Sequence, residues 1–303
     1  MQIYLPLAEM SLNSFVLLAV GALGGFLSGM FGVGGAFVVT PLLIFIGVPP
    51  VIAVGTQSAQ LAGTALSGAI VKNRKGHIDI RMGLVLAIGS LGGVSFGAVL
   101  FQRLRHAGQI DLTINLGYAL ILSIIGFLML RESLTRLRNV VLLPDPSTVK
   151  AWGSTWKMAM VFPASGVVIS VASPLIIGFG CGILTAIFGV GSGFILVPAM
   201  LYLLRMPPVL VAGTSMFQIL FTSAYATIVQ SLMNHNVDIV LALLLLTGSV
   251  IGVRAGGRMA ARISPEVARL LLAVIILLGA YTLWHSLLAT PHELFVMSFG
   301  HLP

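Results

Sequence analysis

Long apolar runs separated by short polar segments dominate the sequence. No Asp, Glu, Lys or Arg occurs between Glu9 and Lys72 or between Lys157 and Arg205. Further charge-free runs lie between residues 81 and 103, 111 and 131, 205 and 238, and 269 and 293. A helix needs about 20 predominantly apolar residues to cross a bilayer. The runs therefore predict a polytopic helical membrane protein, and the residue alternation of a membrane β-barrel is absent.

The chain also repeats itself. Residues 31–41 read FGVGGAFVVTP and residues 188–198 read FGVGSGFILVP, while residues 49–60 read PPVIAVGTQSAQ and residues 207–218 read PPVLVAGTSMFQ. Asp79 then pairs with Asp238, and a glycine triplet that starts at Gly89 pairs with one that starts at Gly248. Four correspondences in the same order indicate an internal duplication.

Each half contains five apolar segments, of which the second is short and carries a proline, Pro41 or Pro198. A hairpin that enters and returns is an alternative to two full crossings by the first two segments. Either way the number of crossings per half is odd, so we expect an all-α polytopic membrane protein of two inverted repeats, as in many secondary transporters. We place the segments near 14–31, 36–47, 51–71, 80–102, 112–130, 167–187, 193–204, 209–231, 239–261 and 268–288.

The distribution of basic residues gives the expected orientation. With the N-terminus outside, 14 of the 16 Lys and Arg residues fall inside, and only Arg103 and Arg105 fall outside. This agrees with the positive-inside rule. We therefore expect a first transmembrane repeat over 1–130, a cytoplasmic connecting loop over 131–165, a second repeat over 166–290 and a C-terminal tail over 291–303. Because the first residues carry no Lys or Arg, we do not expect a cleaved secretory signal.

The glycine-rich stretches FGVGG and FGVGSG are the first candidate site. Adjacent glycines break a helix, and irregular backbone at membrane depth must be buried in protein or line a cavity. Because the following short helix starts there, its N-terminus favours an anion. A tight helix–helix turn is the alternative, and no nucleotide-loop motif is present. The candidate residues are Gly32, Gly34, Gly35, Gly189, Gly191 and Ser192.

Two polar stripes form the second candidate site. Residues 56, 60 and 64 share one helix face, as do residues 214, 218 and 222. Buried polar side chains in membrane helices often mark a pathway, although hydrogen bonding between helices is the alternative. We favour a pathway role for Gln60 and Gln218. The other candidate residues are Thr56, Gln57, Thr214 and Ser215, together with Arg254, which supplies a fixed positive charge or extends to the cytoplasmic surface.

Composition excludes several other functions. The chain is 58% hydrophobic and 8% charged, and its net charge of +8 is scattered between apolar runs, so we expect no nucleic-acid partner. The single Cys181 allows no cysteine-based metal site. No acidic residue lies in mid-membrane, which argues against a cation carrier. No nucleophile–base pair indicates an enzyme, we expect no metal and no cofactor, and nothing indicates an oligomeric state.

The residues of both halves resemble the TauE/SafE family of sulfite exporters, also called TSUP. The resemblance rests on residues 25–56, GFLSGMFGVGGAFVVTPLLIFIGVPPVIAVGT, and on GILTAIFGVGSGFILVPAML and PPVLVAGTS in the second half. It implies a carrier of small sulfur-containing anions, such as sulfite or sulfonates, in the bacterial inner membrane. An anion channel and a carrier of other organic anions are the alternatives.

Overall fold

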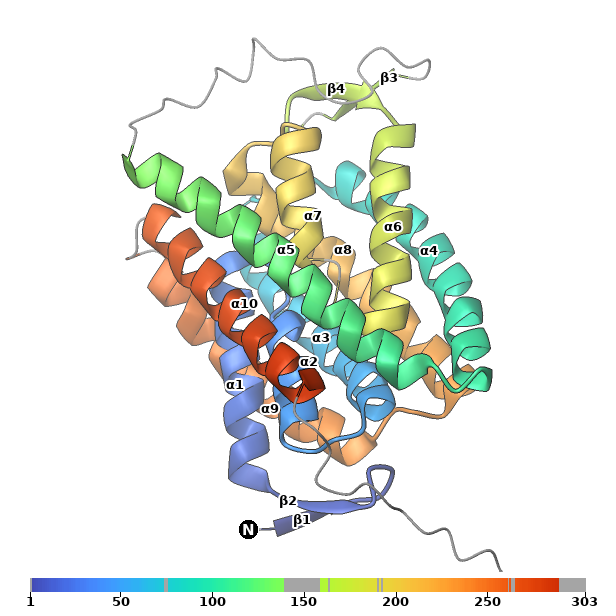
Figure 1. Ribbon diagram of the computed structural model, residues 1–303. Coiled ribbons are helices and arrows are strands. Elements are labelled where there is room, and N and C mark those ends of the chain that lie inside the picture. Colours follow the sequence, from blue (N-terminus) through green and yellow to red (C-terminus); the bar gives the residue numbers. More distant parts are fainter. Residues whose placement is uncertain are drawn as a thin grey trace, which may run out of the picture.

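The computed structural model describes residues 2–73, 76–138, 159–162, 164–189, 191, 193–260, 262 and 265–288, and helices dominate it (Figure 1). Five of the described helices are long and apolar enough to cross a membrane, and further apolar helices are shorter. This confirms the all-α polytopic fold. The first half contains β1 (Gln2–Leu5), β2 (Met10–Asn13), α1 (Ser14–Phe31), α2 (Ala36–Phe45), α3 (Pro50–Asn73), α4 (Ile80–His106) and α5 (Ile110–Arg138).

The second half repeats this order of elements. It contains β3 (Ala159–Phe162), β4 (Val167–Ser170), α6 (Ala172–Phe188), α7 (Gly193–Pro198), the π-helix η1 (Ala199–Leu203), α8 (Pro208–Val229), the π-helix η2 (Gln230–Asn234), α9 (Ile239–Ala260) and α10 (Pro265–Leu288).

Helices α1 and α2 form a hairpin whose turn lies inside the molecule. The turn brings Gly35 against the backbone oxygen of Gly24, and Leu43 packs with Leu17 near the start of α1. Gly47, just after α2, lies next to Met10 of β2. With 10 residues, α2 is about 15 Å long, half the thickness of a bilayer core. Of the two arrangements expected for the first two segments, the structure has the returning hairpin.

Helices α6 and α7 form the corresponding hairpin from the opposite end. Met206, which follows η1, packs with Phe162 of β3 and Ile169 of β4, so the chain returns to the end where α6 begins. In Figure 1 this end lies at the top, and the β1–β2 hairpin lies at the bottom. The two helical hairpins therefore enter the molecule from opposite ends.

Glycines hold two pairs of helices in close parallel contact. Gly21, Gly25 and Gly29 of α1 lie against the backbone of α9, where a Cβ on Gly25 would stand 2.1 Å from the Ser249 oxygen. The glycine triplet that begins at Gly89 of α4 lies in the same way against α6. Any side chain would force these helices apart, which explains the four-residue glycine spacing.

Counterpart helices of the two halves pack antiparallel. Gly55 of α3 lies next to Asn236, whereas Gly68 of the same helix lies next to Met216, so α3 and α8 run in opposite directions. In α5 and α10, Ser123 accepts a hydrogen bond from Trp284 at 3.1 Å, whereas Gly126 lies next to Leu277, so these helices also run in opposite directions. These contacts and those of the α1–α9 and α4–α6 pairs each join a helix of the first half to a helix of the second.

The two β-hairpins were not predicted. Residues 167–170 belong to β4, so the first helix of the second half begins at Ala172 rather than at 167. In the range expected to be a connecting loop, α5 extends to Arg138 and β3 begins at Ala159. Residues 139–158, which form most of that range, and the tail after residue 288 lie outside the described residues.

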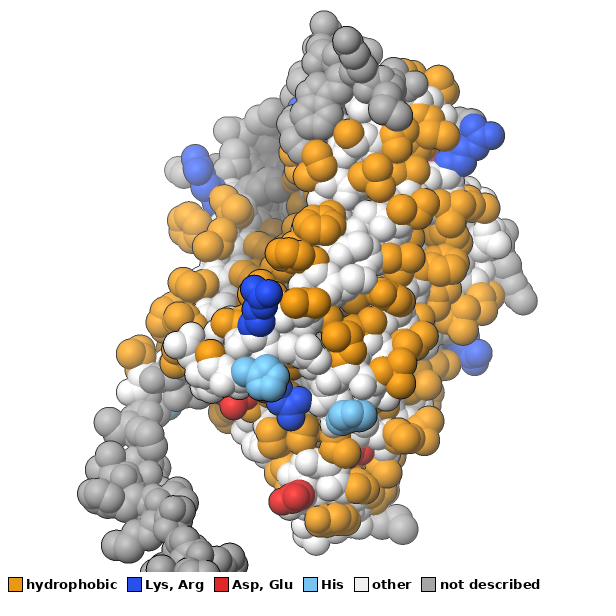
Figure 2. Space-filling view, turned by 90° about the vertical axis from the view of Figure 1, so that its right-hand side faces the viewer, with side chains coloured by type: hydrophobic (Ala, Val, Ile, Leu, Met, Phe, Trp, Pro, Cys, Tyr) orange, Lys and Arg blue, Asp and Glu red, His pale blue; other side chains and the backbone are white. Residues whose placement is uncertain are grey.

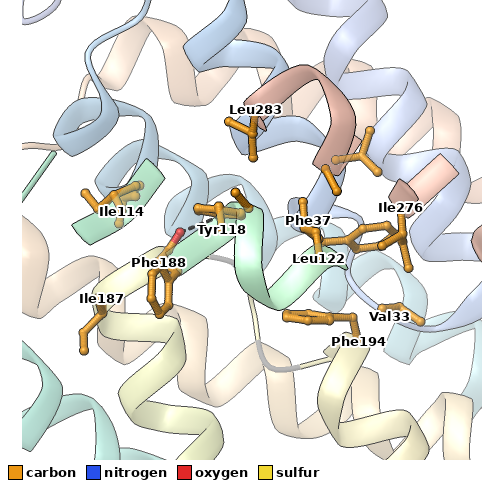
Figure 3. Packing of buried hydrophobic residues seen from close by; sticks show 14 of the residues in the cluster. Val33, Phe37, Ile114, Tyr118, Leu122, Ile187, Phe188, Phe194, Ile276 and Leu283 are labelled. Carbon is orange, nitrogen blue, oxygen red and sulfur yellow. Dashed lines mark hydrogen bonds between the residues drawn. The ribbon is translucent and has the colours of Figure 1, made fainter. Parts of the chain in front are cut away.

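The outer surface suits lipid and the centre is packed with aromatic rings. Figure 2 shows hydrophobic side chains over the described part of one face from end to end, with few charged groups between them. Inside, the ring centroids of the counterparts Phe37 and Phe194 are 6.1 Å apart, so equivalent residues of the two halves meet (Figure 3). The buried Tyr118 hydroxyl donates to the Phe188 oxygen at 2.6 Å and so anchors the end of α6 to α5.

Candidate functional site

Both helical hairpins turn at glycines in the left-handed conformation. Gly32 ends α1 at φ 74° and Gly189 ends α6 at φ 63°, and the N–H of each donates to the carbonyl four residues earlier. Gly34, Gly35 and Gly191 also have positive φ. A side chain would be strained at each of these positions. Val190 and the candidate Ser192 lie outside the described residues.

The two turns meet in the centre of the molecule, each against the other half. Gly193 lies so close to Val33 that a Cβ there would stand 2.0 Å from the Val33 oxygen. The hydroxyl of Ser215 on α8 donates to the Gly32 oxygen at 2.8 Å. Gly189 lies against the Val54 oxygen of α3. The glycine breaks and the polar stripes, predicted separately, therefore form one buried cluster.

At the start of α2, inside this cluster, backbone N–H groups lack acceptors among the described residues. Gly35 has no side chain that could cap the helix. Its backbone oxygen accepts the N–H groups of Val38 and Val39, the first N–H groups of α2 that have an acceptor among the described residues. The N–H groups of Gly34 and Ala36 have no acceptor among the described residues. The start of a helix carries a partial positive charge as well as free donors, an arrangement that suits an anion.

Gln60 and Gln218 are both buried, and each is hydrogen-bonded along its own helix. Gln60 Nε2 donates to the Thr64 hydroxyl at 3.0 Å, and that hydroxyl bonds to Ser249 of α9 at 2.8 Å. The second half repeats the arrangement: Gln218 Nε2 donates to Thr222 at 2.7 Å, and the Thr222 hydroxyl lies 2.5 Å from that of Ser90 on α4. These bonds join α3 to α9 and α8 to α4.

Gln57, next to the first stripe on α3, has an unsatisfied hydrogen-bonding group. Its Nε2 donates to Gln60 Oε1, while its own Oε1 is buried and has no hydrogen-bond partner. Gln57 lies on α3 one turn before Leu61, which contacts both glycine breaks. Because a carboxamide carries two donors and an acceptor, rotating the Gln57 and Gln60 amides would present Nε2 in place of the oxygen. Gln57 therefore has a hydrogen-bonding group that no described residue uses.

The remaining candidates are Thr56, Thr214 and Arg254. Thr56 and Thr214 are buried, and their hydroxyls accept the N–H groups of Asp238 and Asp79, each at 2.9 Å. Arg254 is exposed on α9, apart from the buried cluster. Among the described residues, no three His, Cys, Asp or Glu side chains come together as a metal site.

Comparison with known proteins agrees with this architecture. The sequence profile of the family described as "Sulfite exporter TauE/SafE" matches residues 17–283. The chain belongs to this family. It is 28% identical over 288 residues to a "Probable membrane transporter protein" of Xylella fastidiosa (strain 9a5c), which covers 91% of this chain and 98% of the relative. It is 30% identical over 273 residues to "Probable membrane transporter protein YjnA" of Bacillus subtilis (strain 168), covering 89% of this chain and 99% of the relative.

No solved structure matches the chain significantly. The family expected from the two glycine-rich motifs is nevertheless confirmed, and both halves lie within the matched residues. This TauE/SafE protein is thus a multi-pass membrane transporter, with a buried polar cluster where its two helical hairpins meet.

Proposed function

We propose that the protein is a secondary transporter of small sulfur-containing anions, such as sulfite or sulfonates, across the bacterial inner membrane by alternating access. The observation that carries the proposal is the buried start of α2, where N–H groups lack acceptors among the described residues beside the opposing hairpin. The description of the family as a sulfite exporter supports the substrate class.

The chemistry of the cluster favours an anion over a cation. Asp79 and Asp238 are buried at helix ends, where backbone N–H groups occupy their carboxylates. The central cluster instead offers backbone N–H groups, hydroxyls and carboxamides. Fixed dipoles and neutral donors bind a small oxyanion without a charged partner that would hold it too tightly to release.

The arrangement of the hairpins supports alternating access. The hairpin tips meet in the centre, and their open ends point to opposite ends of the molecule. The parallel pairs α1–α9 and α4–α6 are packed backbone to backbone through glycines, so each pair moves as one unit. Displacing one pair relative to the other would open the central cluster first to one side and then to the other.

Both termini are proposed to be extracytoplasmic and the 131–165 segment cytoplasmic. The odd number of crossings and the excess of Lys and Arg on one side support this orientation. In a bacterium such a helical protein belongs in the inner membrane. No ATP-binding motif is present, so a gradient would drive transport.

Counterflow in proteoliposomes tests the proposal. Vesicles that contain the purified protein are loaded with unlabelled sulfite, and uptake of radiolabelled sulfite or sulfoacetate is followed against protein-free vesicles. We expect saturable uptake that internal substrate accelerates. Uptake that never saturates and shows no acceleration would indicate an anion channel, and equal uptake by both kinds of vesicle would overturn anion transport.

A further inference from the structure

We propose that Leu61 of α3 and Ile219 of α8 form an apolar gate between the two glycine breaks and set the largest anion that passes. This inference rests on the proposed anion transport. Leu61 and Ile219 follow Gln60 and Gln218 directly and occupy equivalent positions in the two halves. Both side chains are 0% exposed.

Leu61 lies between the turns of both helical hairpins. A Cβ on Gly34 would stand 3.1 Å from Leu61 Cδ2, and a Cβ on Gly191 would stand 2.6 Å from Leu61 Cδ1. The two methyl groups of one leucine therefore cover glycine backbone from both halves of the chain.

Ile219 closes the same space from the opposite helix. A Cβ on Gly34 would stand 3.6 Å from Ile219 Cδ1, and one on Gly193 would stand 2.8 Å from the same atom. Gly34 is thus in contact with both gate residues. Because α3 and α8 are antiparallel counterparts, the two side chains approach the hairpin turns from opposite helices.

Leu61 and Ile219 lie apart from the apolar clusters that form the hydrophobic core. Neither Leu61 nor Ile219 belongs to the four apolar clusters formed by other buried side chains. Both side chains lie against glycines of the hairpin turns, and each residue directly follows a buried glutamine. Apolar side chains over N–H groups that lack a described acceptor exclude water from those donors, and an anion reaches the donors only when the side chains move aside. A hydrophobic constriction of this kind blocks ion leakage when it is closed.

The experiment shortens each gate residue and compares two anions of different size. Leu61→Ala and Ile219→Ala are reconstituted, and fluxes of sulfite and benzenesulfonate are measured together with the passive anion conductance. Leu241→Ala is the matched control, because Leu241 is also fully buried but packs in an apolar cluster with Leu5 and Leu17. Leu61→Val and Ile219→Val keep the test valid if the alanine variants fail to fold.

We expect the ratio of benzenesulfonate to sulfite flux to rise on the order of tenfold in the alanine variants, less in the valine variants and not in the control. The passive conductance should rise in the same order. An unchanged ratio and no leak in well-folded Leu61 and Ile219 variants would overturn the gate. A parent protein that moves neither anion would instead overturn the proposed function, so the two failures are distinguishable.

Discussion

The backbone N–H of Asp79 donates to the hydroxyl of Thr214 at 2.9 Å, and so joins the start of α4 in the first half to α8 in the second. Its counterpart is the bond from the Asp238 N–H to Thr56, also 2.9 Å long. Because α3 and α8 are antiparallel, these two bonds lie at opposite ends of the molecule. Both bonds connect the two halves. They use the hydroxyls of Thr56 and Thr214, which the sequence predicted to contact the substrate.

Replacing Thr214 with Val should therefore destabilise the protein. Valine has nearly the same shape but no oxygen, so the buried Asp79 N–H would lose its acceptor, at a cost of about 1–3 kcal/mol. The free energy of unfolding, measured by SDS titration in detergent with far-UV circular dichroism, should fall by this amount. Thr214→Ser should retain most of the stability.

Thr227→Val is the matched control for this prediction. The Thr227 hydroxyl donates to the Ser223 oxygen at 2.7 Å within the same helix, and no described N–H depends on it. If Thr214→Val and Thr227→Val cost the same, the bond to Asp79 contributes no particular stability.

The β3–β4 hairpin should be attached more firmly than β1–β2. Asp79 Oδ2 accepts both the N–H and the hydroxyl of Ser165, whereas Asp238 Oδ2 accepts the single N–H of Leu7. Ser165→Ala removes one hydrogen bond to a buried carboxylate and should cost about 1.5–3 kcal/mol in the same unfolding assay. Ser95→Ala, which changes an exposed serine, should cost less. Equal losses would contradict a special role for the Ser165 hydroxyl.

The sequence predicted the helices better than the hairpins that precede them. Charge-free length and the repeat located the described helices α1 to α10, because those signals extend over many residues. The strands are four residues each, and β4 joins an apolar run that continues into α6. The sequence signal for this hairpin was a short one, namely Gly166 followed by the β-branched residues of VVIS. In the structure Gly166 has φ 67° and lies in the turn.

The repeat also explains why Gln57 received less weight than Gln60. An argument from duplication favours residues present in both halves, such as Gln60 and Gln218. Gln57 corresponds to Ser215, so it breaks the pattern. The structure shows that Gln60 and Gln218 are bonded to Thr64 and Thr222, whereas Gln57 has a buried oxygen without a described partner. Whether a buried side chain finds a hydrogen-bond partner depends on how the helices pack, and the sequence pattern does not predict that packing in such detail.

Gln57→Leu should weaken anion binding about tenfold or more. A hydrogen bond to a charged group contributes about 1.5–3 kcal/mol, and 1.4 kcal/mol corresponds to a factor of ten. Gln60→Leu should act in the same direction because it removes the amide that orients the Gln57 side chain, and we expect a similar loss for Gln218→Leu. Binding of sulfite to purified protein, measured by isothermal titration calorimetry, gives the dissociation constants.

Gln57→Glu should be worse than Gln57→Leu, because a carboxylate repels the anion. Gln102→Leu is a control, since Gln102 is bonded to the Met233 oxygen at 3.2 Å, far along the chain from the glycine breaks. If Gln57→Glu binds sulfite as the parent does, the anion does not approach α3 at this residue.

Glycine at position 235 should stabilise the fold. His235 has φ 49° and corresponds to Gly76, which has φ 67°. The left-handed conformation costs a non-glycine residue about 1–2 kcal/mol. Glycine removes this strain, but it also makes the unfolded chain more flexible, which offsets part of the stabilisation. His235→Gly should therefore raise the free energy of unfolding by up to about 1 kcal/mol.

The converse substitution, Gly76→Ala, should lower the free energy of unfolding by a similar amount. No described atom lies within 4 Å of a Cβ placed on Gly76, so steric contact is not a cause of the loss. If Gly76→Ala instead stabilised the protein, glycine would not be relieving backbone strain at this turn.

Site-directed labelling tests the orientation of the halves. The single Cys181 is buried and is first replaced by Ala, so that an introduced cysteine is the one reactive thiol. Ser298→Cys places a thiol in the C-terminal tail and Thr148→Cys places one in the segment between the halves. With an odd number of crossings per half and the basic residues inside, a membrane-impermeant maleimide should label position 298 in intact spheroplasts. It should label position 148 only after permeabilisation.

The two positions must differ, because the repeat predicts an odd number of crossings between them. Labelling of both from outside would require an even number of crossings in the second half and would contradict the inverted arrangement in the membrane. Labelling of position 148 alone would keep the inversion and reverse the orientation. In that case the β3–β4 hairpin and its Asp79–Ser165 attachment would face the periplasm. The more firmly attached of the two β-hairpins would then lie on the periplasmic side instead of the cytoplasmic side.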